Sequence, residues 1–586
     1  MVAKQKHFQQ LQSSVSNKKQ KHSNRKKLEI CQAAASRTLR GDGCNPFLPA
    51  LPTHESIQLS NPNHDQCQRG HPYGVLPFGN LYTSNIPDCR QSIGIANQIS
   101  IRCLNDEQML GIMGYLNGID LAQLIQTCRY FYVMGHYPDL WRDLMLRSNK
   151  TITFFKESWR DTFVSFHYKD HPHTPISMQG FYSDVLYRPY LCSSFYFDPT
   201  QLLSNNNHPT ISFIPRVDNR TLDPTYFLQT YEQTNQPCII THVTQNWPAY
   251  QKWKNPNYFM DHIPHDTVFR ATSAAAPLPA SFTLKAYFQY CSTFASSNIK
   301  EEAPLYLFDR TFDIKAPHLL QDYQPHLYQS CPYFNPNIDQ HQHDLFHTLG
   351  KNKRPDHRWM IMGPSQNHSG SAFHIDPNAT HAWNAPLSSS KYWIFYPPGI
   401  SPPGIHPSPN GDDVAMPISL GEWFLTYWDQ HVQQRTNPNP NKRPIEGIAH
   451  PGDILFVPHG WWHLVLNLEI KPNPTNVSIA LTQNYVSERN LSDVFRFLKM
   501  KQPQISGCRD RMDAIPPDRL YDEFSKQIRK RDPILWGKAI HASNTGWMCH
   551  AWKDDDTITK KSKSVVERSK LIPNDAFETE FKFSFL

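Results

Sequence analysis

The chain has little that would make it a membrane or secreted protein. None of its apolar runs reaches the ~18 residues that a transmembrane helix needs, and its start has no apolar signal core. Its 12 cysteines are scattered and form no C-x-x-C pair, as expected of reduced, buried thiols. Glycine is also scarce, with 24 residues against 49 prolines in a chain of 586, which favours ordered turns over flexible linkers. We expect an intracellular protein without membrane spans.

Positive charge is concentrated at one end of the chain. The formal net charge is +7, and residues 1–30 alone hold eight Lys or Arg and one Glu. Their densest stretch is KKQKHSNRKK, residues 18–27. This pattern predicts a nuclear-import signal or a nucleic-acid-binding arm on a neutral body, and a solvated tail without a partner is the alternative. We expect the nucleus as location, and otherwise the cytoplasm.

The length of 586 residues predicts two or three folded units. Composition and periodicity divide the chain into a disordered basic and polar tail (1–95), a helical unit (98–150), a connector (151–215), a β-rich domain (216–500), a helical segment (501–540) and a loose tail (541–586). In the β-rich part, short segments of β-branched and aromatic residues recur between proline turns, which predicts a sandwich or barrel. These segments are CIITHV, PLYLFD, RWMIMG, KYWIFYPP, DILFVP, HLVLNL and SIALTQNYV.

One histidine and one aspartate stand two positions apart in SAFHIDPNATHAWNAP, residues 371–386. On a strand, alternate side chains share a face, so His374 and Asp376 would point the same way. Such a pair alone is equally consistent with a surface hydrogen bond. Downstream, HPGDILFVPHGWWHLVLN predicts two turns and two strands, the second of which starts with His463. A jelly roll can bring two strands at this spacing of 89 residues together across its barrel.

Two imidazoles and one carboxylate are the ligand set of non-haem Fe(II) oxygenases, which leave three adjacent positions open for a bidentate co-substrate and O₂. The set contains no thiolate, which argues against a structural zinc site. If 2-oxoglutarate is the co-substrate, its distal carboxylate needs a buried cation and a hydroxyl. Lys391 can supply the cation and Thr482 the hydroxyl. The alternatives are three unrelated polar residues and a lysine that is solvated at the end of its strand.

The motifs HIDP, AWN, GEWF, PGDILFVPHGWWHLVLN and TQN together resemble the Jumonji-C (JmjC) hydroxylases, in the phosphatidylserine-receptor branch, over roughly residues 216–500. The resemblance implies a mainly β double-stranded β-helix, a cupin-like jelly roll, that uses Fe(II), 2-oxoglutarate and O₂. It implies iron at His374, Asp376 and His463, and 2-oxoglutarate at Lys391, Thr482, Asn384, Ser371 and Tyr306. Ser371 stands where threonine is usual, and His459 where glycine is usual, which leaves a ligand swap to His459 open.

Two apolar helical stripes, joined by an Asn117-Gly118 turn, precede the β-rich domain. The first stripe comprises Leu104, Met109, Ile112, Met113 and Leu116. The region resembles an F-box at Leu104, Glu107, Ile112, Leu116, Asp120, Leu121, Cys128, Arg129, Phe131, Leu140 and Trp141, although Asn105 stands where proline is usual. The resemblance implies a Skp-type ubiquitin-ligase adaptor as partner of residues 100–147. An ordinary helical bundle would explain the apolar periodicity equally well.

Three functions therefore remain open from the sequence. We favour hydroxylation of lysyl side chains in a protein substrate, which rests on the resemblance alone. Demethylation of arginine or lysine uses the same metal and co-substrate residues and differs only in which C–H bond faces the iron. In the third function the F-box recruits a ubiquitin ligase, and the jelly roll recognises the target.

Overall fold

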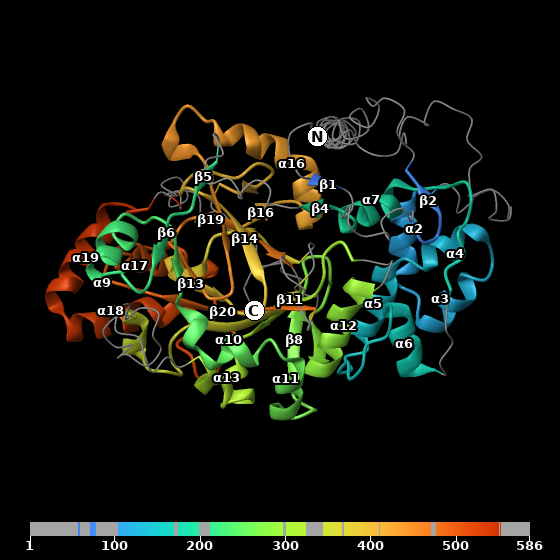
Figure 1. The fold of residues 1–586 in the computed structure, drawn as a ribbon, viewed down its shortest axis with the longest axis horizontal. Coiled ribbons are helices and arrows are strands. Elements are labelled where there is room, and N and C mark those ends of the chain that lie inside the picture. Colours follow the sequence, from blue (N-terminus) through green and yellow to red (C-terminus); the bar gives the residue numbers. More distant parts are fainter. Residues whose placement is uncertain are drawn as a thin grey trace, which may run out of the picture.

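The computed structural model describes residues 57–58, 71–77, 104–168, 174–197, 211–296, 301–323, 344–365, 369–409, 411–469, 476–549 and 551. A nine-stranded and a five-stranded sheet form its centre (Figure 1). Helices gather at its two ends, the N-terminal ones on the right of Figure 1 and the C-terminal ones on the left. The tail over residues 1–95 and the tail after residue 541 lie largely outside the described residues, so their predicted looseness stays a prediction.

The larger sheet has the order β6-β7-β18-β13-β20-β11-β10-β8-β9 and is antiparallel except for the pair β6–β7. Its strands are β6 (Arg216–Asp218), β7 (Cys238–Thr241), β18 (Ile454–Val457), β13 (His381–Pro386), β20 (Val477–Tyr485), β11 (Arg358–Pro364), β10 (Tyr306–Asp309), β8 (Val268–Thr272) and β9 (Ala280–Thr283). The central strands β13 and β18 are buried along their whole length.

The smaller sheet has the order β12-β19-β14-β17-β5. Its strands are β12 (Gly370–His374), β19 (Trp462–Leu468), β14 (Ser390–Tyr396), β17 (Ile445–Ala449) and β5 (Ser212–Phe213). From β11 to β14, and again from β17 to β20, successive strands alternate between the two sheets. This winding confirms the predicted double-stranded β-helix, and all seven segments read as strands from the sequence contain one.

The β-rich region also contains helices that the sequence analysis did not predict. They are α9 (Pro224–Phe227), α10 (Pro248–Lys252), α11 (Pro256–His262), α12 (Leu284–Ser296), α13 (Phe312–Lys315), α14 (Leu319–Asp322) and α16 (Leu420–Arg435).

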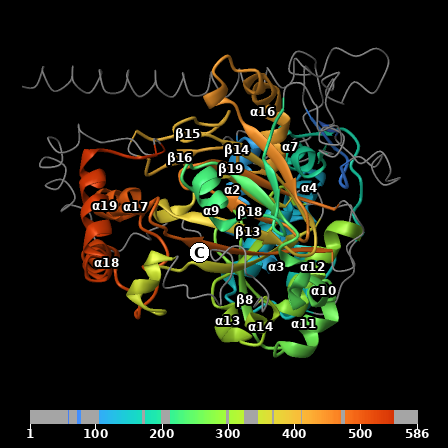
Figure 2. The ribbon, with the colours of Figure 1, turned by 60° about the vertical axis from the view of Figure 1, so that its left-hand side comes forward.

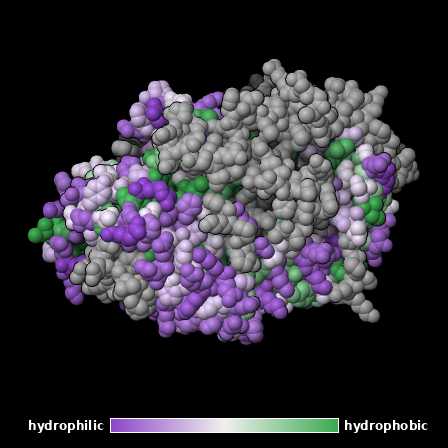
Figure 3. Space-filling model, in the orientation of Figure 1, coloured by the Kyte–Doolittle hydropathy of each residue, from purple (hydrophilic) through white to green (hydrophobic). Residues whose placement is uncertain are grey.

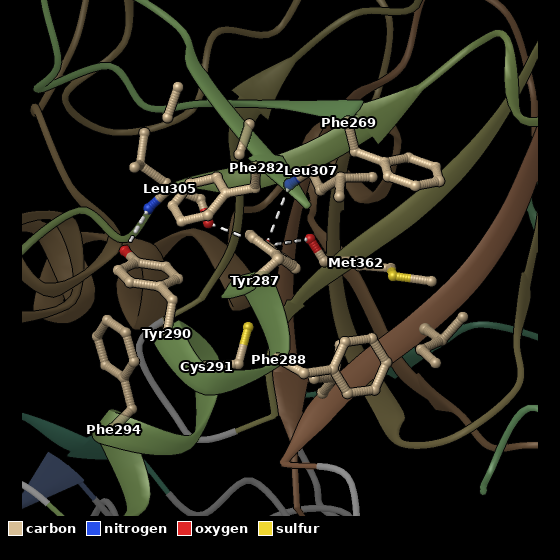
Figure 4. Packing of buried hydrophobic residues seen from close by; sticks show 14 of the residues in the cluster. Phe269, Phe282, Tyr287, Phe288, Tyr290, Cys291, Phe294, Leu305, Leu307 and Met362 are labelled. Atoms are coloured by element: carbon tan, nitrogen blue, oxygen red, sulfur yellow. Dashed lines mark hydrogen bonds between the residues drawn. The ribbon is translucent and has the colours of Figure 1, made fainter. Parts of the chain in front are cut away.

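Figure 4 shows how α12 is anchored. The buried Tyr287 hydroxyl lies 3.0 Å from Leu305 O, 2.8 Å from Met362 O and 3.2 Å from the Leu307 N–H. One side chain thus ties the helix to β10 and β11.

The N-terminal helical unit comprises α2 (Asp106–Met113), α3 (Gly118–Leu124), α4 (Arg129–Gly135), α5 (Pro138–Arg147) and α6 (Trp159–His167). Asn105, which stands in place of the usual proline, forms a capping box with Gln108 and so starts α2. The first predicted stripe divides in the fold, because Met109 and Met113 are buried while Ile112 is 47% exposed. Ile112 is therefore a surface residue rather than part of the helical core.

This helical unit is packed against the jelly roll. The Arg142 guanidinium donates to Ala275 O at 2.6 Å, and the Trp159 indole donates to Glu301 at 2.6 Å. The backbone of Ile152 forms a bridge to Phe282 on β9. One continuous apolar cluster runs from α2 to β20. The connector that follows contributes α7 (Asp184–Ser193) and the short strands β3 (Phe181–Tyr182) and β4 (Tyr196–Phe197).

The C-terminal helices are α17 (Leu491–Met500), α18 (Pro517–Arg531) and α19 (Pro533–Thr545), and they pack together at one end of the molecule (Figure 2). The last helix runs to Thr545, five residues past the boundary expected from the sequence. No helix in the described ranges has the length and apolar character that a membrane crossing requires.

Candidate metal and co-substrate site

One cavity, lined from both sheets, brings together the eight residues that the resemblance implies as metal ligands and 2-oxoglutarate contacts. They are Tyr306, Ser371, His374, Asp376, Asn384, Lys391, His463 and Thr482. These residues come from six strands or strand ends that are widely separated in the chain. The jelly-roll winding therefore creates this site, and no short segment could form it alone.

The two histidines face each other across neighbouring strands. His374 ends β12, is paired directly with His463 on β19, and the ring centroids lie 4.0 Å apart. The sequence spacing predicts two strands that meet across the barrel, but β12 and β19 are hydrogen-bonded neighbours in the smaller sheet. The register shifts between Ser371 and His374. Such a bulge is a common means of re-aiming a side chain beside a functional site.

Each imidazole has its Nδ1 atom engaged with the backbone two residues earlier. His374 Nδ1 lies 2.7 Å from Ala372 O, and His463 Nδ1 lies 3.1 Å from Trp461 O. A ring N–H that donates to a carbonyl leaves Nε2 with its lone pair, which is the form that binds metals. Burial lowers the pKa of His374 to about 4 and that of His463 well below its usual value. Both rings are therefore neutral at neutral pH.

Asp376 reaches the histidines from a turn and not from a strand, which corrects the expectation of simple alternation. β12 ends at His374, and a 3₁₀ turn at Pro377–Ala379 follows, with Asn378 at φ 58° in the left-handed region. The turn is fixed from outside, because the Asn378 amide donates to Ser506 O at 3.0 Å and accepts from the Ser506 N–H at 3.0 Å. The carboxylate position thus depends on a segment about 130 residues further along the chain.

The carboxyl group of Asp376 has an unusual environment. Burial raises its pKa to about 7, and a hydrogen bond from the Asn484 side chain opposes this shift. Its Oδ2 atom is buried and has no hydrogen-bond partner in the described part of the chain. Ligand atoms of Asp376, His374 and His463 all lie within 4.8 Å of one another. A buried acceptor without a donor, beside two imidazole lone pairs, fits a divalent cation, and the N/O donor set suits Fe(II).

The other end of the cavity holds a buried cation without a carboxylate partner in the described ranges. Lys391 on β14 is 2% exposed and donates to Asn467 Oδ1 at 2.6 Å and to the Tyr306 hydroxyl at 3.2 Å. Burial lowers the pKa of its ammonium group to about 7. A buried charge with neutral partners fits an anionic ligand, because a carboxylate would offset the loss of hydration.

The remaining predicted residues line the same cavity and differ in whether their hydrogen-bonding groups are already engaged. Thr482 lies opposite Asn384 across β20 and β13, and its hydroxyl donates to Trp383 O at 2.8 Å. The Thr482 hydroxyl can therefore accept a hydrogen bond from a ligand in this conformation. It could donate one to a ligand only if its hydrogen bond to Trp383 O were broken. Asn384 Oδ1 is buried and without a partner among the described residues. Ser371 lines the cavity from β12.

Sequence reasoning missed Asn467, which organises the lysine end of the cavity. Besides accepting from Lys391, it donates to the Tyr306 hydroxyl at 3.0 Å and to Ser369 Oγ at 2.6 Å, and accepts from Ser478 Oγ at 3.0 Å. The available signal was its place four residues after His463, on the same face of a strand. It is completely buried, as is usual for an amide whose hydrogen bonds are satisfied.

His459, which the sequence left open as a substitute ligand, does not line this cavity, and neither does the basic residue Arg358. His459 points to the C-terminal helices, where its Nε2 lies 2.9 Å from Asp493 Oδ2. Arg358, the first residue of β11, donates to Asp313 at 3.0 Å. The cavity thus brings His463 rather than His459 to Asp376, and Lys391 is its basic residue among those described.

Comparison with known proteins agrees with this geometry. Residues 224–490 match the model of a cupin-like domain, and residues 104–147 match that of an F-box-like segment. The arginine-specific demethylase JMJ22 of Arabidopsis thaliana is 36% identical over 79% of this chain and 82% of its own length. The bifunctional arginine demethylase and lysyl-hydroxylase psr-1 of Caenorhabditis elegans is 33% identical over 52% of this chain and 68% of its own. The human 2-oxoglutarate and iron-dependent oxygenase JMJD4 is 25% identical over 49% of this chain and 65% of its own length.

The chain therefore belongs to the cupin-like JmjC family of Fe(II)- and 2-oxoglutarate-dependent oxygenases. It carries an F-box-like segment ahead of the catalytic domain.

Proposed function

We propose that this oxygenase binds Fe(II) through His374, Asp376 and His463 and 2-oxoglutarate through Lys391, and hydroxylates lysyl side chains of a protein. One observation carries the assignment: a partnerless buried carboxylate oxygen and two imidazole Nε2 atoms stand at one end of a cavity that has a buried lysine at the other. Tyr306, Thr482, Asn384 and Ser371 are the proposed further contacts to 2-oxoglutarate.

When bound, Fe(II), 2-oxoglutarate and O₂ supply the chemistry that inserts one oxygen atom into a substrate C–H bond, with succinate and CO₂ as co-products. The contribution of the chain is to hold and orient the metal and the co-substrate. The carbonyls of Ala372 and Trp461 keep both imidazole Nε2 atoms free of protons. Lys391, held by Asn467, is placed to receive the distal carboxylate. The burial of Lys391 and His463 lowers the local dielectric, which strengthens these electrostatic contacts.

Lysyl hydroxylation is favoured because psr-1 is named for it. Phe308, Trp359 and Trp393 line the cavity, and aromatic rings can stabilise a lysyl cation. Arginine demethylation is the second candidate, since JMJ22 and psr-1 are both named for it. A methylated guanidinium is also a cation, so the same walls accept it.

Intact-mass analysis of a peptide library treated with the protein, Fe(II) and 2-oxoglutarate separates the candidates. A gain of one oxygen atom on lysyl peptides is expected from the proposed activity. Loss of one CH₂ unit from methylated arginine or lysine, with formaldehyde released, would instead assign a demethylase. Succinate formation that depends on Asp376 tests the site assignment whichever substrate reacts.

A docking role is favoured separately by the surface of the N-terminal helical unit. An open groove on it is lined by Leu104, Leu110, Ile112, Tyr115 and Leu140. Tyr115 is 91% exposed and Ile112 47%, and hydrophobic surface is visible over this unit at the right-hand edge of Figure 3. We propose that the groove binds a Skp-type adaptor, so that the oxygenase and a ubiquitin ligase could act on the same protein.

The basic stretch over residues 18–27 lies outside the described residues. We propose that it serves nuclear import, with nucleic-acid binding as the alternative. The location of a fluorescent fusion with and without residues 1–30 tests import. Retention of the truncated fusion in the nucleus would argue against it.

A further inference from the structure

The turn that precedes His463 is held by the far C-terminal end of the described chain. This turn lies between β18 and β19 and contains His459 and Gly460. The His459 carbonyl accepts from the Asn235 amide at 3.0 Å and from the Cys549 thiol at 3.5 Å. The His459 N–H donates to His381 Nδ1 at 3.1 Å. The N–H and the C=O of His459 are therefore both fixed by other parts of the fold.

Asp493, in the first turn of α17, is the centre of these contacts. It is completely buried, and its carboxylate accepts from the Met548 N–H at 2.7 Å and the Cys549 N–H at 2.9 Å. The same carboxylate lies 2.9 Å from His459 Nε2. One side chain thus joins the segment after α19 to the turn before the proposed metal ligand.

Gly460 shows how closely the two segments approach. Its φ of +79° lies in the left-handed region, and a Cβ added there would stand 2.3 Å from Cys549 Sγ and 2.7 Å from Ala551 Cβ. The C-terminal segment therefore lies directly on the turn. A side chain at this position would displace one of the two.

Trp461 links the turn to His463. Its indole N–H donates to Asn235 O at 2.7 Å, and its carbonyl is the acceptor that orients the His463 ring. We propose that Asp493, His459 and the Met548–Cys549 backbone form a positioning clamp that sets His463 for metal binding. This inference rests on the proposed role of His463. Asp493 and His459 are positioning residues, because neither lines the cavity.

The same three side chains could be read as a second metal site, since ligand atoms of His459, Asp493 and Cys549 lie within 4.8 Å of one another. Hydrogen bonds explain the cluster better. Asp493 already accepts from two backbone N–H groups and lies at hydrogen-bond distance from the imidazole. Burial raises the pKa of the Cys549 thiol, with the Asp493 charge adding to the shift, which favours the protonated form over a thiolate ligand.

The test compares Asp493→Asn with Asp322→Asn in the full-length protein. Asp322 on α14 is a matched control, because it is 2% exposed and likewise receives three donors, from Lys252, Trp253 and Tyr258. For each variant, Mn(II) binding is measured by electron paramagnetic resonance and stability by the melting temperature. Both variants should lose stability. Asp493→Asn alone should weaken Mn(II) binding, by roughly 10-fold or more, as outer-shell changes do.

A second pair of variants tests the clamp if Asp493→Asn fails to fold. His459→Leu removes the donor to Asp493, whereas His459→Gln can keep a donor near the Nε2 position. Leucine should weaken Mn(II) binding and glutamine should restore most of it. Equal affinity in the leucine variant and the wild type, or equal weakening by Asp322→Asn, would overturn the clamp.

Two further results separate this inference from the function on which it rests. Loss of Mn(II) binding in Asp376→Ala, with none in the clamp variants, would overturn the clamp alone. Persistent binding in Asp376→Ala would overturn the metal site itself. One equivalent of zinc that disappears in Cys549→Ser would replace the hydrogen-bonded clamp with a structural metal site.

Discussion

Replacing Lys391 by methionine should make the ligand-free protein more stable while it destroys co-substrate binding. Burial lowers the pKa of this ammonium group from 10.5 to about 7. Since one pH unit corresponds to about 1.4 kcal/mol, the buried cation costs on the order of 5 kcal/mol in the absence of an anion. Methionine keeps the apolar stem and removes that cost. A bound 2-oxoglutarate would then lose its cation, at roughly 2 to 5 kcal/mol, or about 30- to 4,000-fold in affinity.

Calorimetry of 2-oxoglutarate binding to the Mn(II) form, together with the melting temperature, measures both effects. Lys501→Met is the control, because Lys501 is 7% exposed and lies at the end of α17 outside the cavity. Binding by Lys391→Met within about twofold of wild type, equivalent to less than about 0.5 kcal/mol, would refute the reasoning.

The same lysine predicts a pH dependence. Between about pH 7 and 10.5 the unfolded chain keeps a proton that the folded chain has lost, so the stability of the ligand-free protein should rise with pH across this range. Affinity for 2-oxoglutarate should fall over the same range, because the ligand needs the charged lysine. An arginine stays charged over this whole pH range. If the Lys391→Arg variant still binds 2-oxoglutarate, its affinity should therefore not depend on pH. A pH-independent affinity in the wild type would contradict the assignment.

Three other predictions concern the metal, the co-substrate and the adaptor. Asp376→Ala should abolish Mn(II) binding and succinate formation, and full turnover would exclude Asp376 as a ligand. Gly363→Ala places a Cβ 2.0 Å from the Tyr306 ring, so it should raise the KM for 2-oxoglutarate while Mn(II) affinity stays unchanged. Ile112→Ser with Tyr115→Ser should abolish co-purification with a Skp-type adaptor, at about 2 kcal/mol for each lost anchor, and leave turnover intact.

The strands could be predicted because β-branched and aromatic runs between prolines are a strong local signal. The two longer helices inside the β-rich region, α12 and α16, also have local signals in the sequence. Ser419 precedes Glu422 by three residues, and its side chain accepts from the Glu422 N–H at the start of α16. In α12, apolar residues recur at Leu284, Tyr287, Cys291 and Phe294, which is helical spacing. Short proline-started helices such as α10 offer no comparable period.

His374, Asp376 and His463 could be singled out from the sequence, but not the way in which Asp376 approaches the two histidines. Alternation along a strand gave the right neighbours for the wrong reason, because the strand stops at His374. The left-handed turn at Asn378 delivers the carboxylate, and the hydrogen bonds to Ser506 that hold this turn cross from another part of the chain. A local pattern carries no information about such a contact.

Asn467 was missed for a related reason, because its role depends on the register between two strands. Lys391 lies directly opposite Asn467 on β14 and β19, and Phe395 lies directly opposite His463 in the same pairing. A slip by one residue would turn every side chain of one strand to the other face. The proposed metal ligand and the amide that holds the co-substrate lysine would then leave the cavity together. The β14–β19 register thus couples the two halves of the site, which predicts that substitutions that disturb this pairing reduce metal binding and 2-oxoglutarate binding together.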